Sequence, residues 1–172
     1  MERTSDPSLV IDRAQTLTTE MYDQIGVALV WRGLKHCPKE PRPIVIRLSV
    51  DSPWKVFPGA LAVSYPFEGV DIRVFYDRVR AATSCPLRVL LAHVLAHEIG
   101  HILQGDDRHS ASGVMKRRWD LSDYRRMARQ PLPFTDLDIR GIRRGLDARA
   151  DRLFAERMSE LASRPRVHAE IR

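Results

Sequence analysis

The residues of this chain whose types and spacing can do chemistry are His97, Glu98 and His101, which form the pattern His-Glu-x-x-His. Histidines four positions apart on a helix project from one face, about one turn apart, so that their imidazoles can bind one zinc ion together. Glu98 is not an expected ligand. We expect it to take a proton from the zinc-bound water, whose pKa zinc lowers to roughly 7, and to pass that proton to the leaving amine.

A third ligand is needed, because a catalytic zinc site has three protein ligands and one water. Gly105 is placed to end the helix and turn the chain back, and three candidates follow it. We expect His109 to be the ligand, since its position after the turn allows it to return to the metal. Asp107 is the alternative, and Asp106 is the third choice.

The segment that carries the motif, from about Pro86 to Leu103, is apolar nearly all round, which predicts a helix in the centre of a domain. Ionisable residues inside such a helix cost free energy unless they are used, so their presence favours a functional site. His93 lies one turn before His97 on the same face, and we expect it to be a hydrogen-bonded core histidine. Thr83 and Ser84 are expected to cap this helix.

Other elements are expected on both sides of the motif helix. Upstream, periodicity predicts a short strand at residues 8–11, a helix over 12–25 ended by Gly26, strands at 27–31 and 44–50, a proline-rich loop between these two strands, a short edge strand at 59–65 and a strand at 70–79. Downstream, it predicts a short helix over 121–128 and a last helix that begins at a Thr135-x-x-Asp138 capping box and runs to about residue 163, followed by a frayed tail.

The stretch from Leu87 to Met115 resembles the metzincin clan of zinc peptidases. In that clan His-Glu-x-x-His is followed by a glycine, by a third histidine or aspartate, and by a turn that contains methionine. The resemblance implies that Gly105 is the turn glycine and that Met115 forms an apolar floor beneath the metal without binding it. It assigns the three ligands and the general base to His97, His101, His109 and Glu98.

The spacing after the second histidine differs from that of the clan. Seven residues lie between His101 and His109, two more than in the clan, and the glycine comes one position later. No tyrosine follows Met115, so the extra ligand that some subfamilies carry there is absent, whereas the dipeptide His109-Ser110 is similar to the matrixin subfamily. The chain is therefore expected to be a compact and atypical metzincin-like protein.

The resemblance implies an α+β zincin fold: a mixed, mostly parallel twisted sheet with an antiparallel edge strand, packed on an N-terminal helix and the buried active-site helix, with C-terminal helices. Residues 1–172 would form one catalytic domain, with the sheet and active-site helix in 1–105 and the third ligand, Met-turn and C-terminal helices in 106–172. Substrate would add to the sheet edge as a strand. The expected edge is Gly59, Ala60, Leu61, Ala62, Val63 and Ser64, with Trp119 and Tyr124 beside the pocket for the residue after the scissile bond.

Composition limits the alternatives. With 172 residues, 44% of them hydrophobic and 29% charged, the chain has the composition of one soluble globular domain, for which a monomer is the default. No apolar run reaches the roughly 20 residues that a membrane span requires. The net charge is +6, but the arginines are spread over the second half, so nucleic acid is not the expected partner.

Redox state and location stay open at this point. Cys37 and Cys85 each precede a proline and could form one disulfide or remain two thiols. The N-terminus has no charged segment followed by an apolar one. The protein is therefore expected in the cytoplasm if the chain is complete, and secreted or periplasmic if a signal was removed.

The sequence favours a zinc-dependent endopeptidase in which Glu98 activates the water. An alternative is a catalytically inactive zincin-fold protein that binds peptides or holds a structural zinc. A third and less favoured reading is a metal-dependent endoribonuclease of the bacterial type that carries His-x3-His-x5-His and is often basic. Glu98, the Met-turn and the longer gap before His109 argue against that reading.

Overall fold

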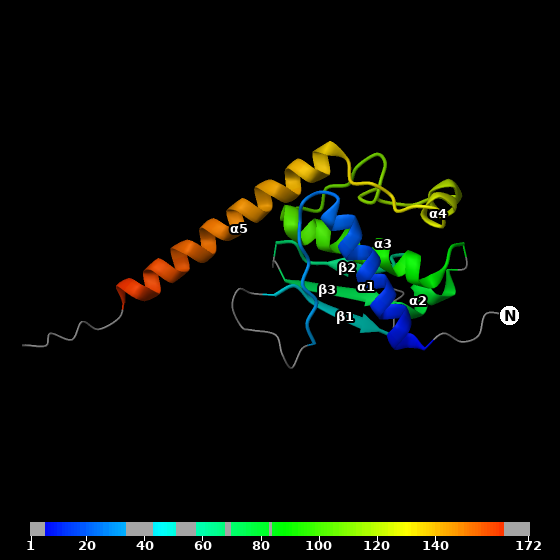
Figure 1. Cartoon of the computed structure of the whole chain (residues 1–172), viewed down its shortest axis with the longest axis horizontal. Helices are drawn as coiled ribbons and strands as arrows, with labels where there is room; N and C mark the ends of the chain where they lie inside the picture. Colours follow the sequence, from blue (N-terminus) through cyan, green and yellow to red (C-terminus); the bar gives the residue numbers. More distant parts are fainter. Residues whose placement is uncertain (1–5, 34–42, 51–57, 68–69, 83, 164–172) are drawn as a thin grey trace, which may run out of the picture.

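The computed structural model describes residues 6–33, 43–50, 58–67, 70–82 and 84–163. These residues form a mixed α+β architecture with one three-stranded sheet and five helices (Figure 1). None of the described helices is both long enough and apolar enough to cross a membrane. In chain order the elements are α1 (Pro7–Asp23), β1 (Val45–Ser49), β2 (Ala62–Ser64), β3 (Asp71–Phe75), α2 (Tyr76–Ala81), α3 (Leu87–Gln104), α4 (Leu121–Met127) and α5 (Asp136–Ala162).

Helix α1 packs along α3 through one apolar face. It begins where Pro7 fixes the first helical position and where the side chain of Asp6 accepts a hydrogen bond from the backbone of Ser8. Its buried residues recur at helical spacing and are Val10, Ala14, Thr18, Met21 and Tyr22. The Tyr22 hydroxyl donates to the carbonyl of Ala96 in α3, 2.9 Å away, so a buried hydrogen bond adds to the packing.

The sheet places β3 in the middle, paired in parallel with β1 and antiparallel with β2. Ile72 and Val74 of β3 are buried, whereas β2 forms an edge. Arg78 of α2 donates to the carbonyl oxygen of Ala60 at 2.7 Å. This bond fixes the segment that leads into the edge strand.

Helix α3 lies at the centre of the molecule and contacts α1, α5 and the strands β2 and β3 (Figure 1). Every residue from Leu90 to Leu103 is buried, which explains why the segment is apolar on all sides. The helix ends at Gly105, whose φ of 69° lies in the left-handed region that favours glycine. The chain then turns back over the same helix.

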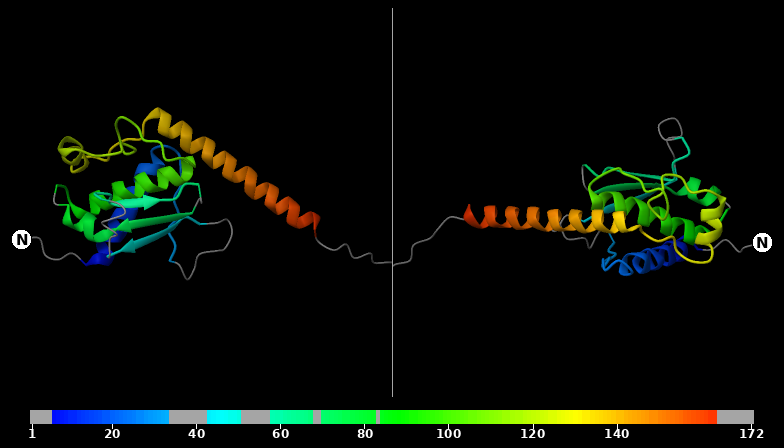
Figure 2. Two further views of the ribbon diagram at one scale, coloured as in Figure 1. Left: turned by 180° about the vertical axis from the view of Figure 1, so that it is seen from behind. Right: turned by 90° about the horizontal axis from the view of Figure 1, so that it is seen from above.

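Helices α4 and α5 both begin with a capping box, formed by Asp120 with Asp123 and by Thr135 with Asp138. The N-terminal part of α5 packs on α3, and the rest of α5 extends away from the body of the molecule (Figure 2). The close packing depends on Gly145, because a Cβ atom there would lie 1.7 Å from the carbonyl oxygen of Leu103.

Most expected elements are confirmed, with shifted ends. The helix expected over 12–25 is α1, and Gly26 follows it with a φ of 76°. The strands expected at 44–50 and 59–65 are β1 and the shorter edge strand β2, and the helices at 86–103, 121–128 and 135–163 are α3, α4 and α5. Most of the expected loop, the tail from residue 164, Trp54 and Cys37 lie outside the described residues, while Cys85 is a buried free cysteine.

One expected strand is wrong and another is shorter than expected, because in both places a helix begins earlier than the apolar pattern indicates. Residues 8–11 belong to α1, since Asp6 and Pro7 start the helix before them. The strand expected at 70–79 ends at Phe75, where α2 begins. The expected cap of α3 is also wrong: Pro86 is the capping residue, with no side-chain hydrogen bond, and Thr83 lies outside the described residues.

The strand expected at residues 27–31 is wrong as well. The Val27 amide donates to the carbonyl of Tyr22, and the Trp31 indole donates to the hydroxyl of Thr19 at 2.9 Å. The segment therefore packs along α1 instead of joining the sheet. Without it, the described sheet has one parallel and one antiparallel pairing, so it is mixed rather than mostly parallel.

Candidate metal centre

Three histidines meet at the C-terminal half of α3. His97 and His101 come from the helix and His109 comes from the turn that follows it, and one ring nitrogen of each lies within 4.8 Å of the other two. The ring centroids are 4.7 Å apart for His97 and His101, 5.3 Å for His97 and His109, and 4.7 Å for His101 and His109. The three side chains are therefore close enough to hold one metal ion.

Hydrogen bonds to backbone carbonyls orient the two helical histidines. Nδ1 of His97 lies 2.8 Å from the carbonyl oxygen of Val114, and Nδ1 of His101 lies 3.0 Å from that of Asp106. A carbonyl oxygen only accepts, so Nδ1 must carry the proton in both rings. Each neutral ring then has its lone pair on Nε2, which is the tautomer that a metal ligand needs.

The two Nε2 atoms face each other across 3.1 Å. With both protons on Nδ1, two lone pairs point at the same place, and this arrangement is repulsive unless a cation lies there. Two nitrogens bound to one tetrahedral zinc, with bonds of about 2.0–2.1 Å, lie about 3.3 Å apart. The observed separation of the rings of His97 and His101 thus fits a shared ion.

Burial favours the neutral form of the two helical rings, whereas His109 is exposed. Desolvation lowers the pKa of His97 to about 4, because the buried ring cannot hydrate a positive charge, and the hydrogen bond to Val114 opposes this only in part. Desolvation also lowers the pKa of His101, with a further contribution from His97. The pKa of His109 is lowered by burial and by the positive charge of Arg117. Neutral imidazoles can donate to a metal at neutral pH without first losing a proton.

Glu98 connects the histidine cluster to the sheet edge. Burial raises the pKa of its carboxyl, and hydrogen bonds from the side chain and backbone of Ser64 and the proximity of His101 oppose that rise. Ser64 is the last residue of β2. The Leu61 carbonyl and the Tyr65 amide bond to β3, so the backbone groups of Ala62 and Ser64 point to the outer edge by the alternation of an antiparallel ladder.

Met115, the methionine of the expected Met-turn, is fully buried. It packs against Gly100 of α3, where a Cβ atom would come within 2.6 Å of the methionine sulfur. A larger residue at position 100 would require the end of the Met115 side chain to move, and Met115 directly follows Val114, whose carbonyl orients His97. The glycine within the motif is thus explained by its close packing against Met115.

The turn that contains Met115 is tied to the start of α5. The Ser110 amide donates to the carbonyl of Met115 at 2.9 Å, and its hydroxyl donates to the carboxylate of Asp138 at 2.5 Å. The Val114 amide donates to the carbonyl of Pro133. These bonds fix the loop between the third histidine and the methionine from outside.

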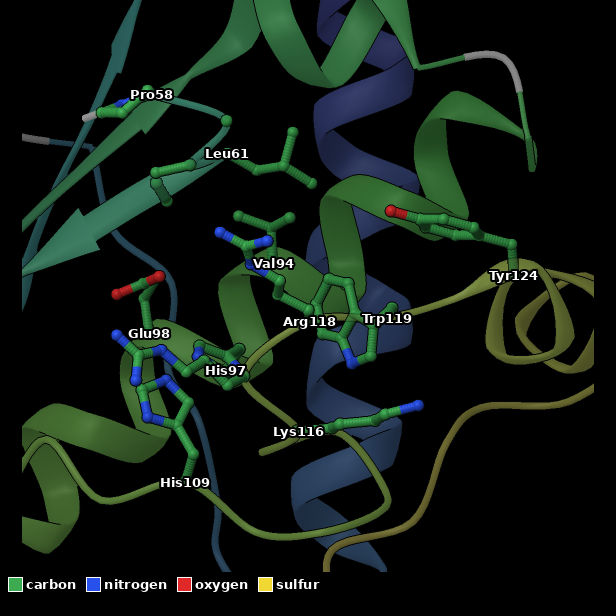
Figure 3. A pocket seen from close by; sticks show the side chains of 14 residues that line it. Pro58, Leu61, Val94, His97, Glu98, His109, Lys116, Arg118, Trp119 and Tyr124 are labelled. Atoms are coloured by element: carbon green, nitrogen blue, oxygen red, sulfur yellow. The ribbon is translucent and has the colours of Figure 1, made fainter. Parts of the chain in front are cut away.

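A pocket of about 530 Å³ opens beside the cluster (Figure 3). One wall is the edge segment before β2, the floor is α3, and the opposite wall is the segment after Met115. Its described lining is Pro58, Gly59, Ala60, Leu61, Ala62, Val94, His97, Glu98, His109, Lys116, Arg117, Arg118, Trp119 and Tyr124.

The structure brings most sequence-predicted site residues together. The three histidines form one cluster, and Glu98, Trp119 and Tyr124 line the pocket together with His97 and His109. Met115 is buried against Gly100. Residues 59–62 of the expected substrate edge also line it, whereas residue 64 bonds to Glu98 and residue 63 is not among the lining residues. Asp107 is not part of the cluster within the described residues.

His93 stays outside the cluster, as expected. Its Nδ1 lies 2.7 Å from the carbonyl of Val89, and its Nε2 accepts a hydrogen bond from the amide of Leu132 at 3.0 Å. Both ring nitrogens are therefore used in the core. Asp106 contributes a backbone carbonyl to His101 rather than its carboxylate.

Sequence reasoning missed Asp138 and Arg118. The capping role of Asp138 was visible in the pattern, but its bond to Ser110 joins residues 28 positions apart and leaves no local signal. Arg118 lines the pocket and had a signal, the run Lys116-Arg117-Arg118-Trp119 immediately after the methionine.

Comparison with known proteins gives no match for this chain among family models, curated proteins or solved structures.

Proposed function

We propose that this protein is a zinc-dependent endopeptidase with a metzincin-like catalytic site. His97, His101 and His109 would hold the ion, and Glu98 would act as general base and acid. The observation that carries the proposal is the distance of 3.1 Å between the Nε2 atoms of His97 and His101. Because both Nδ1 atoms donate to carbonyls, the lone pairs of these two Nε2 atoms face each other. Three neutral imidazoles are also the donor set that a catalytic zinc takes.

The role of the ion is limited and general: zinc, when bound, supplies a Lewis acid that lowers the pKa of water towards neutrality and polarises a carbonyl. The chain itself supplies the proton transfer. Glu98 directly follows His97 in the sequence and is buried. The raised pKa of its carboxyl suits a group that takes a proton from the attacking water and returns it to the leaving amine. His97 and His101 are held in one orientation by their carbonyl partners.

The edge strand supports a peptide as substrate. The outer edge of β2 pairs with no other strand in the described part of the chain, and Ala62 presents its backbone amide and carbonyl there. An extended peptide can pair with such an edge, and Glu98, bonded to Ser64, lies at the end of that edge. The scissile bond would then pass between the edge strand and the histidines.

Peptide cleavage by the zinc-loaded protein tests this proposal. Purified wild type should cleave members of a mixed peptide library, with products identified by mass spectrometry. Glu98→Ala should lose at least about 100-fold in rate, as expected for loss of a general base, while it retains bound zinc by elemental analysis. Glu156→Ala, which removes an exposed glutamate on α5, is the matched control and should cleave as the wild type does.

Three results would contradict the proposal. Cleavage that survives Glu98→Ala would remove Glu98 from the mechanism. Zinc binding without cleavage of any peptide would indicate a binding or structural role for the site. Cleavage of single-stranded RNA in place of peptides would indicate a nuclease.

A further inference from the structure

We propose that the pocket beside the metal centre selects a carboxylate on the substrate, and that Arg118 is the residue that binds it. The inference rests on the proposed peptidase function and specifies the substrate class: peptides that place an acidic side chain or a free C-terminal carboxylate in this pocket. The geometry that points to it is the placement of Arg118 and Trp119 in one pocket wall opposite the edge segment (Figure 3).

The charges that line the pocket are unequal. Among the described lining residues, three cationic ones are consecutive, Lys116, Arg117 and Arg118, whereas Glu98 carries the single carboxylate. Glu98 is already engaged by Ser64. A metal ion at the histidines would add further positive charge. An anionic group is therefore the substrate feature that this pocket stabilises most.

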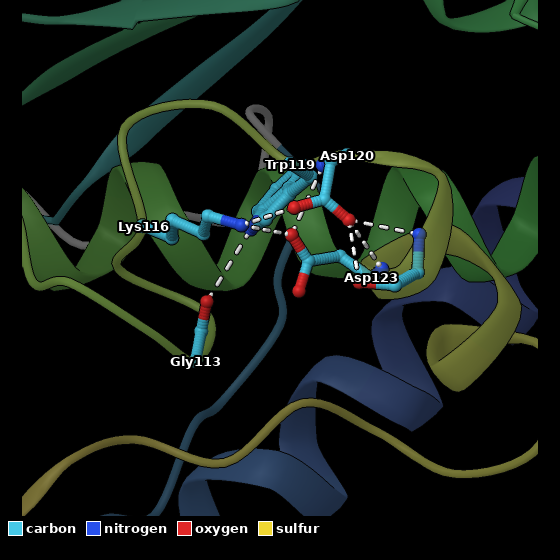
Figure 4. Close-up of polar contacts among 6 residues, drawn as sticks. Gly113, Lys116, Trp119, Asp120 and Asp123 are labelled. Carbon is cyan, nitrogen blue, oxygen red and sulfur yellow. Dashed lines mark hydrogen bonds and ion pairs between the residues drawn. The ribbon is translucent and has the colours of Figure 1, made fainter.

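Lys116 is not available to a substrate, because two aspartates of its own segment neutralise it. Its ammonium lies 2.7 Å from Asp120 and 2.6 Å from Asp123 (Figure 4). Asp120 and Asp123 also form the capping box of α4. The ion pairs thus fix this wall of the pocket and leave Arg117 and Arg118 as the available cations of the described lining.

Arg117 and Arg118 have no ion pair with any carboxylate of the described residues. They differ in position. Arg117 lies close enough to His109 to lower its pKa, which places its charge beside the metal centre. Arg118 is directed into the pocket between Leu61 and Glu98 in Figure 3. Arg118 is therefore the one placed to meet the end of a substrate side chain.

The remaining walls suit the stem of such a side chain. Leu61, Val94 and Trp119 supply apolar surface around the space that Arg118 faces. Trp119 is held by a hydrogen bond of 3.4 Å from its indole nitrogen to the carbonyl of Gly113. A guanidinium next to apolar walls binds a carboxylate through two parallel hydrogen bonds, a geometry that lysine cannot reproduce.

Matched peptides test the inference. Pairs that differ only by Asp or Asn, and by Glu or Gln, at the residue after the cleaved bond isolate a side-chain carboxylate. Pairs with a free or an amidated C-terminus one residue after that bond isolate a terminal carboxylate. We expect wild type to prefer the carboxylate of one set by about 10-fold to 100-fold in kcat/KM, the range of a charged hydrogen bond.

Variants assign the preference to Arg118. Arg118→Gln should reduce the carboxylate preference at least about 10-fold, and Arg118→Lys should restore part of it. Arg118→Glu should shift the preference towards Lys at the same position, a gain that a misfolded protein cannot show. Arg126→Gln, an exposed arginine on α4 outside the pocket, is the matched control and should keep the wild-type ratio.

Binding separates this inference from the proposed function. Zinc-loaded Glu98→Ala should bind fluorescein-labelled Asp peptides more tightly than Asn peptides by anisotropy, and Glu98→Ala/Arg118→Gln should not. If wild type cleaves no peptide but this difference persists, the peptidase proposal fails and the carboxylate site stands. Equal cleavage and binding of carboxylate and amide peptides would overturn the inference. A carboxylate preference that survives Arg118→Gln would also overturn it, and so would tighter binding of RNA than of any peptide.

Discussion

His97 and His101 each use one ring nitrogen to fix their orientation and leave the other for a metal. The acceptors are the carbonyls of Val114 and Asp106, which belong to the loop after α3 and not to the helix. The loop thus does more than carry the third ligand: it sets the tautomer of the first two. This dependence explains why the turn from His109 to Met115 must be as well fixed as the helix.

The third ligand can be identified by a pair of substitutions. His109→Ala should raise the Kd for zinc by more than about 100-fold, beyond the 10–100-fold loss typical of an outer partner. Asp107→Ala should change the Kd by less than about 10-fold, because Asp107 acts on His109 through its charge and a backbone hydrogen bond and is not part of the histidine cluster. Zinc titration with a chromophoric chelator measures both. A large effect of Asp107→Ala with a small one of His109→Ala would assign the carboxylate as ligand.

The metal-free protein should lose stability as the pH falls from about 6.5 towards 4. Burial depresses the pKa values of His97 and His101 in the folded state, so in this range the unfolded chain binds more protons than the folded one. The stabilisation is present above the unfolded pKa and is lost as the pH falls towards the folded pKa. Each ring contributes up to about 1.4 kcal/mol per pH unit.

Urea unfolding at pH 7.5, 6 and 5 measures this dependence. A variant with His97→Asn and His101→Asn should show a shallower loss over the same range, since the asparagine side chains do not titrate. An equally steep loss in that variant would assign the dependence to other groups, such as the buried His93.

At the scale of elements, α3 is held from both sides by helices that approach it closely. Helix α5 reaches the end of α3 at Gly145, where a Cβ atom would meet the Leu103 backbone oxygen at 1.7 Å. A backbone atom cannot move out of the way as a side chain can. The position of α5 matters to the site, because Asp138 near its start holds Ser110 of the turn.

Gly145→Ala should therefore destabilise the protein by about 2–3 kcal/mol, although alanine favours the helix by about 1 kcal/mol. Gly141→Ala is the matched control on the same helix, because the atoms nearest to its Cβ, at 3.2 Å, belong to the flexible side chain of Gln104. It should be neutral or slightly stabilising. Chemical denaturation measures the free energy of unfolding of both variants. Equal values would show that the close approach of Gly145 to Leu103 does not restrict which residue α5 can carry there.

The elements also show what local sequence can predict. The buried α3 followed from its composition, α4 from periodicity and α5 from its capping box, because these signals lie within one segment. The strand expected at 8–11 was wrong because a short apolar run does not distinguish a strand from a helix. The capping residue Asp6, which precedes the run, starts a helix there. The strand at 27–31 failed because its partner is α1, which periodicity does not reveal.

The site divides in the same way. His97, Glu98 and His101 were predictable from helix geometry, and His109 from the turn after Gly105 and from the metzincin resemblance. The bonds of Ser64 to Glu98 and of Ser110 to Asp138 join distant segments, and only the fold brings them together. Their residue types alone carried no signal of pairing.

At the scale of the whole molecule, zinc should act as a stabilising ligand because its donors come from α3 and from the loop that α5 anchors. At a free zinc concentration about 1,000 times Kd, binding adds about 4 kcal/mol, which raises the Tm by roughly 8–16 °C for a chain of this size. Calorimetry with and without a chelator measures the shift. A Tm that does not change on zinc removal would contradict a site shared between these elements.

The position of the ion itself is the most direct test of the proposed metal centre. Anomalous scattering at the zinc edge, measured on crystals of the zinc-loaded protein, locates it without any assumption about activity. We expect one ion at about 2.0–2.1 Å from a ring nitrogen of each of His97, His101 and His109, with Nε2 as the donor of the first two. An ion elsewhere, or one bound by Asp107 in place of His109, would contradict the account.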